Sequence, residues 1–205
     1  MTRAKLFTSC LAAAQQCCAP TVPIVPDEME NSPAVAVNAF TGADVARFLL
    51  ERGWAGSELS AEQMAWCEHA AAILRTHAAD RYALEELLRL VFHYDSREIL
   101  GRVESHAVLS RFGARDVLRR LALLLLEGGA LDSDRFKAIV TSLKESLDIR
   151  GRDLFHPIRL ALAGRAGEGE LDRVILLLDE AAGASFAGPV KSARDRILEF
   201  CAALD

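Results

Sequence analysis

Three arginines of this sequence have a spacing that would let them bind a ligand together. Arg111, Arg115 and Arg119 lie four residues apart, a spacing that places side chains on one face of an α-helix. Such a row of guanidinium groups can follow the phosphates of a nucleic acid. The alternative is a solvated helix face on which Asp116 and Glu127 balance the charge, and the row alone leaves both interpretations open.

Catalytic and metal-binding patterns are missing from the sequence. A nucleophilic centre needs an activating base, and the five histidines are scattered without a pattern such as HExxH. The five cysteines form no CxxC pair of the kind that zinc sites use. The glycine-rich stretch 164–169 lacks the Lys-Ser/Thr of a phosphate-binding loop. We therefore expect no catalytic residue, no metal and no cofactor.

Composition limits the classes of protein further. The 205 residues are 51% hydrophobic and 26% charged, which is ordinary globular composition. The net charge of −5 gives no global attraction to nucleic acid, but residues 97–165 hold 13 Lys/Arg against 9 Asp/Glu, a local excess of +4. The longest apolar run, Leu121–Leu126, is too short to span a bilayer. An odd number of unpatterned cysteines favours a reducing, cytoplasmic location.

The elements that must position these residues are predicted to be helices. Residues 1–40 read as a short amphipathic helix followed by a Pro-rich, partly disordered linker. Capping signals at Thr41, Ser60, Asp95 and either Asp132 or Ser133 then begin a series of helices. The predicted helices cover about 42–53, 61–76, 83–92, from 95 on, 114–127, 133–147, 157–163, 170–182 and 189–203. No stretch alternates apolar and polar residues as a strand does. The pattern predicts an all-α fold with two consecutive helical subdomains, 41–95 and 96–205.

One segment carries a family resemblance. It contains Gly151, Leu154-Phe155, Pro157-Ile158-Arg159 and Ala161-Leu162-Ala163-Gly164. These residues match, in type and spacing, the all-helical anticodon-binding region at the C-terminus of bacterial, class I glutamyl-tRNA synthetases. Upstream, Leu84-Glu85-Glu86-Leu87 and Val91-Phe92-His93-Tyr94-Asp95 resemble another stretch of that region. The similarity covers about residues 58–182 and extends more loosely over 41–200.

The resemblance implies a non-catalytic module that binds tRNA. The chain contains neither the His-x-Gly-His-type nor the Lys-Met-Ser-Lys-type signature of the synthetase catalytic half, so a freestanding anticodon-binding domain is expected. The turn after Gly164 lies against the anticodon in the family. The RNA-contacting residues implied or predicted are Arg159, Gly164, Arg165, Glu168, Gly169, Leu171, Arg111, Arg115 and Arg119.

The sequence departs from the family pattern at the turn. Ala163 stands where the family usually has Thr, and the turn carries Glu168 and Glu170 but no proline. Carboxylates that face phosphates are repelled. A second hypothesis is therefore a protein-interaction or regulatory module that keeps the helical fold and has lost RNA binding.

Arg159 has two interpretations of its own. Pro157 is expected to begin a short helix that Gly164 ends, with Arg159 in the first turn. An arginine beside an exposed turn suits unpaired bases, which proteins read by stacking and hydrogen bonds. Alternatively, Arg159 pairs with a carboxylate such as Asp153 and is only structural.

Overall fold

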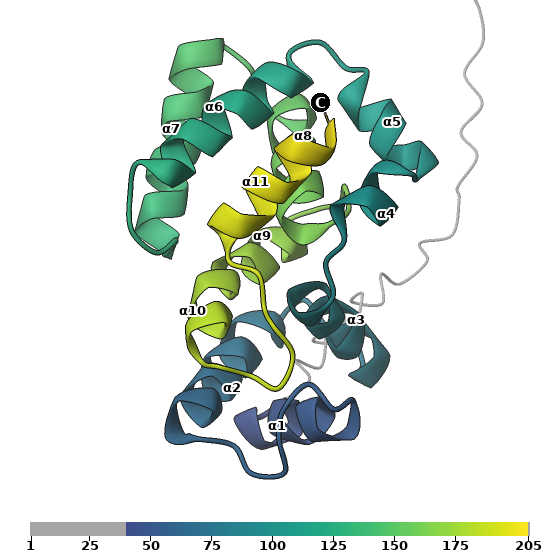
Figure 1. Ribbon diagram of the computed structural model, residues 1–205, viewed down its shortest axis with the longest axis vertical. Coiled ribbons are helices and arrows are strands. Elements are labelled where there is room, and N and C mark those ends of the chain that lie inside the picture. The colour runs from purple at the N-terminus through teal and green to yellow at the C-terminus, as the bar shows by residue number, and fades with distance from the viewer. Residues whose placement is uncertain (1–39, 205) are drawn as a thin grey trace, which may run out of the picture. The chain divides into compact units, whose positions relative to one another are not determined.

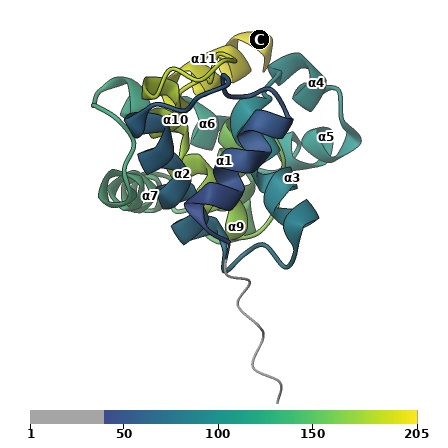
Figure 2. The same cartoon turned by 90° about the horizontal axis from the view of Figure 1, so that it is seen from below.

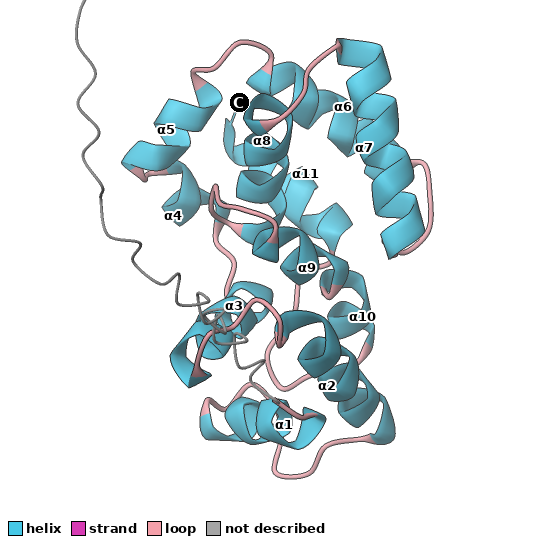
Figure 3. Ribbon diagram, turned by 180° about the vertical axis from the view of Figure 1, so that it is seen from behind, coloured by secondary structure: helices cyan, strands magenta, loops and turns pink. Residues whose placement is uncertain are grey.

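All regular structure in the described part of the chain is helical, which confirms the predicted all-α fold. The computed structural model describes residues 40–204, so the helix and linker expected in residues 1–39 lie outside the described residues. Figure 1 and Figure 3 show the arrangement of the helices. In chain order they are α1 (Gly42–Glu51), α2 (Ala61–Leu74), α3 (Arg81–Phe92), α4 (Ser96–Leu100), α5 (Val103–Leu109), α6 (Ala114–Leu126), α7 (Ser133–Leu147), α8 (Arg152–Ala163), α9 (Glu170–Leu176), α10 (Leu178–Gly183) and α11 (Ala193–Leu204).

The predicted capping signals begin helices in the structure. The Thr41 side chain accepts a hydrogen bond from the Asp44 backbone N–H, while the Asp44 carboxylate accepts one from the Thr41 N–H. Ser60 and Gln63 form the same reciprocal pair at α2. Each pair satisfies two backbone donors that the first helical turn would otherwise leave unpaired. The structure confirms both helix starts. The sequence could predict them because a capping box joins residues only three positions apart.

Three predicted helix boundaries are wrong. The helix expected to begin at Pro157 is α8, which begins at Arg152 and carries Pro157 inside it. The helix expected at Pro189 is α11, which begins at Ala193 after Ser192. There the Asp195 N–H donates to the Ser192 hydroxyl. The single helix expected over 170–182 is divided between α9 and α10 at Leu177.

Pro157 is tolerated inside α8 for a physical reason. The missing N–H of Pro157 would have paired with the carbonyl of Asp153, one helical turn earlier. Asp153 is exposed, so water can bond to that carbonyl instead. Proline therefore did not mark the helix start; Gly151, with φ +58, is the residue from which α8 begins.

The first helices pack onto the later part of the chain through aromatic side chains. Helix α1 lies across α2, as Figure 2 shows from below. The indole N–H of the fully buried Trp66 on α2 donates to the carbonyl of Leu177 at 3.2 Å. The rings of Trp66, Phe92 and Phe186 meet edge to face, with centroids 5.1–5.6 Å apart. Such pairs add to the free energy that burial of the rings provides.

Arg196 on α11 forms hydrogen bonds to the C-terminal ends of two other helices. It is 0% exposed, and Nη1 donates to the carbonyls of Leu90 and Leu162 while Nη2 donates to that of Val91. These carbonyls belong to the last turns of α3 and α8, where a cation is favoured by the helix dipole. Its guanidinium also lies 4.6 Å from the centre of the Tyr94 ring. Burial lowers the pKa of Arg196 to about 10, so the group stays charged at neutral pH.

Residues 40–204 belong to one compact unit. Tyr94 donates its hydroxyl proton to the carbonyl of Ala161 at 2.5 Å, so contacts cross the boundary expected at residue 95. The division into subdomains 41–95 and 96–205 stays a prediction.

Candidate functional site

The turn between α8 and α9, residues 164–169, is held from beneath by a buried arginine. Arg159 is 7% exposed, and its Nε and Nη2 atoms donate to the two carboxylate oxygens of Asp172 at 2.7 and 2.8 Å. Its Nη1 atom donates to the carbonyl of Gly167 at 2.6 Å. Its guanidinium also lies 5.0 Å from the centre of the Phe155 ring. All three nitrogens are engaged, so Arg159 positions the turn rather than facing a ligand.

This geometry decides between the two interpretations of Arg159. The pairing with a carboxylate is confirmed, but the partner is Asp172 and not Asp153. The expected place in a first helical turn is wrong because α8 begins at Arg152. Leu171 is also fully buried. A Cβ added to Gly167 would meet the Leu171 side chain at 2.7 Å, so Leu171 packs directly under the turn.

A second arginine fixes the start of the same turn. Arg102 donates from Nη1 to the carbonyl of Gly164 at 3.1 Å and from Nη2 to Glu98 at 2.6 Å. Gly164 has φ +83, a conformation that costs other residues free energy. The side chain of Ile99 lies 3.2 Å from where a Cβ on Gly164 would be. The turn therefore leaves α8 in one fixed conformation.

The outer rim of the turn faces solvent. Glu168 and Gly169 are exposed, and Arg165 is half-buried. Arg152 approaches the Glu168 carboxylate to 3.7 Å, with side chains 76% and 71% exposed. An ion pair this exposed contributes little to stability, so another anion can displace Glu168 from Arg152 at small cost.

Arg111 reaches the same side of α8. Its Nη1 atom lies 3.2 Å from Nδ1 of His156 and 3.7 Å from the carboxylate of Asp153. The prediction that Arg111 shares one helical stripe with the other two arginines is wrong. Helix α6 begins only at Ala114, after Gly113 with φ +73, so Arg111 lies in the preceding connection.

Arg115 and Arg119 are exposed on α6. Arg119 lies 3.6 Å from the Asp116 carboxylate, as the solvated-face alternative expects. Arg115 lines a pocket with His106 of α5 and Leu204 of α11. The structure thus brings Arg111 to His156 and Asp153 on α8 and places Arg115 at a pocket between α5, α6 and α11. We call residues 164–169 with Arg111, Arg152 and His156 the α8 turn site.

His156 lies at the centre of this positive charge. Burial, followed by the charges of Arg111, Arg159 and Arg152, lowers the pKa of His156 below its usual value. Its Nε2 atom is buried and has no hydrogen-bond partner among residues 40–204. The imidazole is therefore neutral at pH 7, and it can approach three guanidinium groups without added repulsion.

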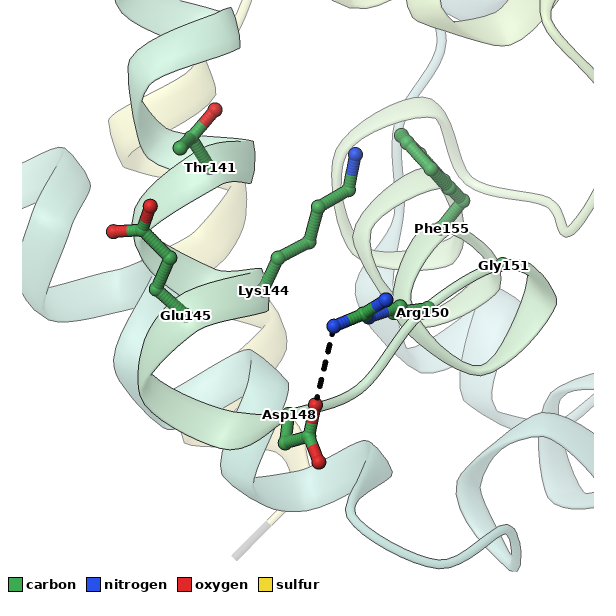
Figure 4. Close-up of a pocket in the computed structure, with 7 residues that line it drawn as sticks. All are labelled: Thr141, Lys144, Glu145, Asp148, Arg150, Gly151 and Phe155. Atoms are coloured by element: carbon green, nitrogen blue, oxygen red, sulfur yellow. Dashed lines mark ion pairs between the residues drawn. The ribbon is translucent and has the colours of Figure 1, made fainter.

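A pocket of about 590 Å³ adjoins the site where α7 ends and α8 begins. Figure 4 shows Lys144 of α7 extending toward Phe155 of α8, and Nζ lies 5.6 Å from the centre of that ring. Arg150 in the connection between the helices lies 3.6 Å from Asp148. The pocket therefore combines an aromatic wall with two cationic side chains and two acidic ones, Glu145 and Asp148.

The sequence did not single out several residues of this region. Arg102, Asp172, His156 and Lys144 bond to or contact the site through partners distant in sequence, although Arg102 also pairs with Glu98 four residues earlier. Arg102, for example, bonds to a carbonyl 62 positions away. For Arg159 and Asp172 a signal was available, because a buried apolar stretch that contains an arginine needs a carboxylate nearby.

In the described part of the chain, no group of three or more His, Cys, Asp or Glu side chains could hold a metal ion. None of the helices within residues 40–204 is long and apolar enough to cross a membrane.

Comparison with known proteins gives consistent matches. The chain is 36% identical to glutamate–tRNA ligase 2 of Syntrophus aciditrophicus over 77 residues, 38% of this chain and 16% of that protein. It is 30% identical to glutamate–tRNA ligase of Bacillus subtilis over 130 residues, 63% of this chain and 26% of that protein. The corresponding ligase of Bacillus mycoides is 29% identical over 132 residues. The chain therefore spans about a quarter or less of the length of these relatives. No solved structure matches it.

A family model adds the match with the widest coverage. Residues 43–181 match the model described as an anticodon binding domain. The match runs from α1 into α10, includes the α8 turn site, and covers more than half of the sequence. The chain belongs to the anticodon-binding domain family.

Proposed function

We propose that this chain is a tRNA-binding module that contacts RNA with the α8 turn site. The observation that carries the proposal is the construction of the turn. Arg159 and Arg102 hold it from two sides, while its rim stays open to solvent. A rigid, exposed turn beside cationic side chains suits the unpaired bases of an RNA loop, because little freedom is lost on binding.

The roles of the predicted residues follow from their surroundings. Arg111, Arg152 and Arg165 contact phosphates, and the backbone near Gly169 approaches the bases. Arg159, Gly164 and Leu171 position the turn. Arg115 and Arg119, exposed on α6, add phosphate contacts if the RNA extends in that direction. Such contacts give affinity that falls as salt rises.

Glu168 limits the affinity in this proposal. Its carboxylate occupies Arg152, and a phosphate that binds Arg152 must displace it. The exposed pair is weak, so displacement costs little, yet the negative charge remains close to the RNA. Glu168→Gln would remove both the competitor and the repulsion.

The relatives suggest which RNA to test first. They are named as glutamate–tRNA ligases, so a tRNA that accepts glutamate is the first candidate, and binding to it places the protein in the cytoplasm. We also propose that the module does not activate glutamate, since the matched region is a quarter or less of each ligase. Glutamate-dependent pyrophosphate exchange by the purified chain would overturn that part.

The test is a salt-titrated binding series with an unmodified transcript of this tRNA. Arg152→Gln should weaken binding and lower the slope of log affinity against log salt by about one. Glu168→Gln should strengthen binding at low salt and lose its effect as salt screens the charge. Arg194→Gln, an exposed change on α11, is the control and should leave binding unchanged.

A second candidate function is a protein-interaction module. Its support is that Arg111, Arg152 and Arg159 each have a carboxylate partner in the structure. If wild-type protein shows no saturable tRNA binding at low salt, RNA recognition is excluded and this second function takes its place.

A further inference from the structure

A phenylalanine in the connection between α5 and α6 projects fully into solvent. Phe112 is 94% exposed, the highest value among the large apolar side chains of residues 40–204. Exposure of a single apolar side chain is ordinary at a mobile loop tip. Phe112 does not lie at such a loop tip, because the residues before and after it are held by contacts with other parts of the chain.

The residue that follows Phe112 is packed against another connection. Gly113 has φ +73, and a Cβ added there would overlap the side chain of Ile149. Ile149 lies between α7 and α8, so the two connections, residues 110–113 and 148–151, are in contact. Glycine is favoured at position 113 by its backbone conformation, and any side chain there would also have to displace the end of the Ile149 side chain.

The residue that precedes Phe112 is held by its side chain and its backbone. Arg111 contacts Nδ1 of His156 and the carboxylate of Asp153, and its carbonyl accepts a hydrogen bond from the Ala114 N–H at 3.2 Å. The ring of Phe112 is therefore presented from a braced turn. Because the backbone on both sides of the ring is held, little backbone freedom is lost when a ligand covers the ring.

Charged residues are frequent in the two connections that meet at Phe112 and Gly113. The two connections and the first residues after them carry Arg111, Arg115, Arg150 and Arg152 against Asp116, Asp148 and Asp153. An apolar protein partner would need a wider apolar patch than one ring. An exposed aromatic ring next to Arg111, with a small local excess of positive charge, fits a nucleotide, since a base stacks on the ring while its phosphate binds arginine.

We propose that Phe112 is a stacking platform for an unpaired base, a second RNA contact beside the α8 turn site. The proposal rests on the proposed function, because it needs an RNA bound along α8. Arg111 belongs to both contacts: it reaches His156 on α8 and adjoins the ring in sequence. The pocket of Figure 4 lies along the same 148–151 connection. Its Lys144 and Arg150 would provide phosphate ligands for the continuing strand once a phosphate replaces Asp148, the exposed ion-pair partner of Arg150.

The experiment compares full-length wild type with three variants in filter-binding assays. The probes are the tRNA transcript and an RNA duplex of similar length without unpaired bases. Phe112→Ala should weaken tRNA binding by about 5- to 100-fold, as loss of one stacked base does. It should leave the salt slope and the duplex affinity unchanged. Phe112→Trp should bind tRNA at least as tightly as wild type.

Tyr82→Ala is the matched control, because Tyr82 on α3 is also an exposed aromatic residue, 77% accessible. It should bind tRNA like wild type, and all variants should keep the wild-type unfolding temperature. If wild type binds tRNA and Phe112→Ala binds equally well, the platform is wrong while the proposed function stands. Equal weakening toward tRNA and duplex would also overturn base stacking. If wild type binds no tRNA, both proposals fail.

Discussion

Arg159 shows how one side chain can resemble a ligand-binding residue and serve another purpose. An arginine at the end of a helix, beside an exposed turn, suggests RNA contact, yet its three nitrogens are all used by Asp172 and Gly167. Guanidinium geometry makes this arrangement specific, since a lysine ammonium cannot form the two parallel bonds to the carboxylate.

Arg159→Lys is therefore expected to lower the free energy of unfolding by about 2–4 kcal/mol, since it breaks a mostly buried pair and frees the carbonyl of Gly167. Urea unfolding measures the change. Arg173→Lys on the exposed side of α9 is the control and should shift stability by less than about 0.5 kcal/mol. A similar loss in both variants would contradict the bracing role.

His156 should make stability depend on pH. Its pKa in the folded protein is lowered, mainly by burial and then by Arg111, so the unfolded chain binds a proton more readily. Stability from this residue is fully present above the unfolded pKa of about 6.5 and is lost as pH falls toward the folded value.

His156→Gln should remove that part of the pH dependence, measured as unfolding midpoints between pH 7.5 and 5. His106→Gln, an exposed change on α5, is the control for the effect of replacing a histidine on stability at pH 7.5. An unchanged profile in His156→Gln would refute the assignment.

Helix positions could be predicted from contacts between residues close in sequence, whereas contacts between distant residues could not be predicted. The boxes at Thr41 and Ser60 identified α1 and α2 because a cap joins residues three apart. Pro157 gave a wrong helix start, because the rule that proline begins helices does not consider whether the carbonyl four residues earlier, here that of Asp153, can bond to water. Most of the α8 turn site could not be predicted, since Arg102 and Arg111 bond to residues 62 and 45 positions away.

The turn after α8 depends on its first glycine. Gly164→Ala would force alanine into φ +83 and bring its Cβ against Ile99, so we expect a loss of about 1–2 kcal/mol in unfolding free energy. Gly129→Ala, at a position with no atom near the new Cβ, is the comparison for thermal unfolding. Equal midpoints for the two variants would mean that the turn adapts to a side chain.

For the whole molecule, Arg196 joins parts of the chain that lie far apart in sequence. It bonds to carbonyls 106, 105 and 34 positions away. Removal of its guanidinium would leave buried carbonyls of α3 and α8 without partners, and each such group costs free energy. Residues 41–95 and 96–205 should therefore unfold together.

Arg196→Met is expected to destabilise the protein by more than about 3 kcal/mol in urea. Arg194→Met, two residues away and exposed, should stay within about 0.5 kcal/mol of wild type. Wild type should show one cooperative transition in calorimetry. Two separate transitions would instead mean that the predicted subdomains are thermodynamically independent.

The position of the tryptophans has a further consequence. Both tryptophans of the sequence, Trp54 and Trp66, precede residue 95, and the Trp66 indole bonds to the carbonyl of Leu177 from the other side of that boundary. Intrinsic tryptophan fluorescence therefore reports on the contact between α2 and Leu177. If α2 separates from Leu177, the indole of Trp66 passes from a dry environment into water and its emission shifts to the red, without any added dye.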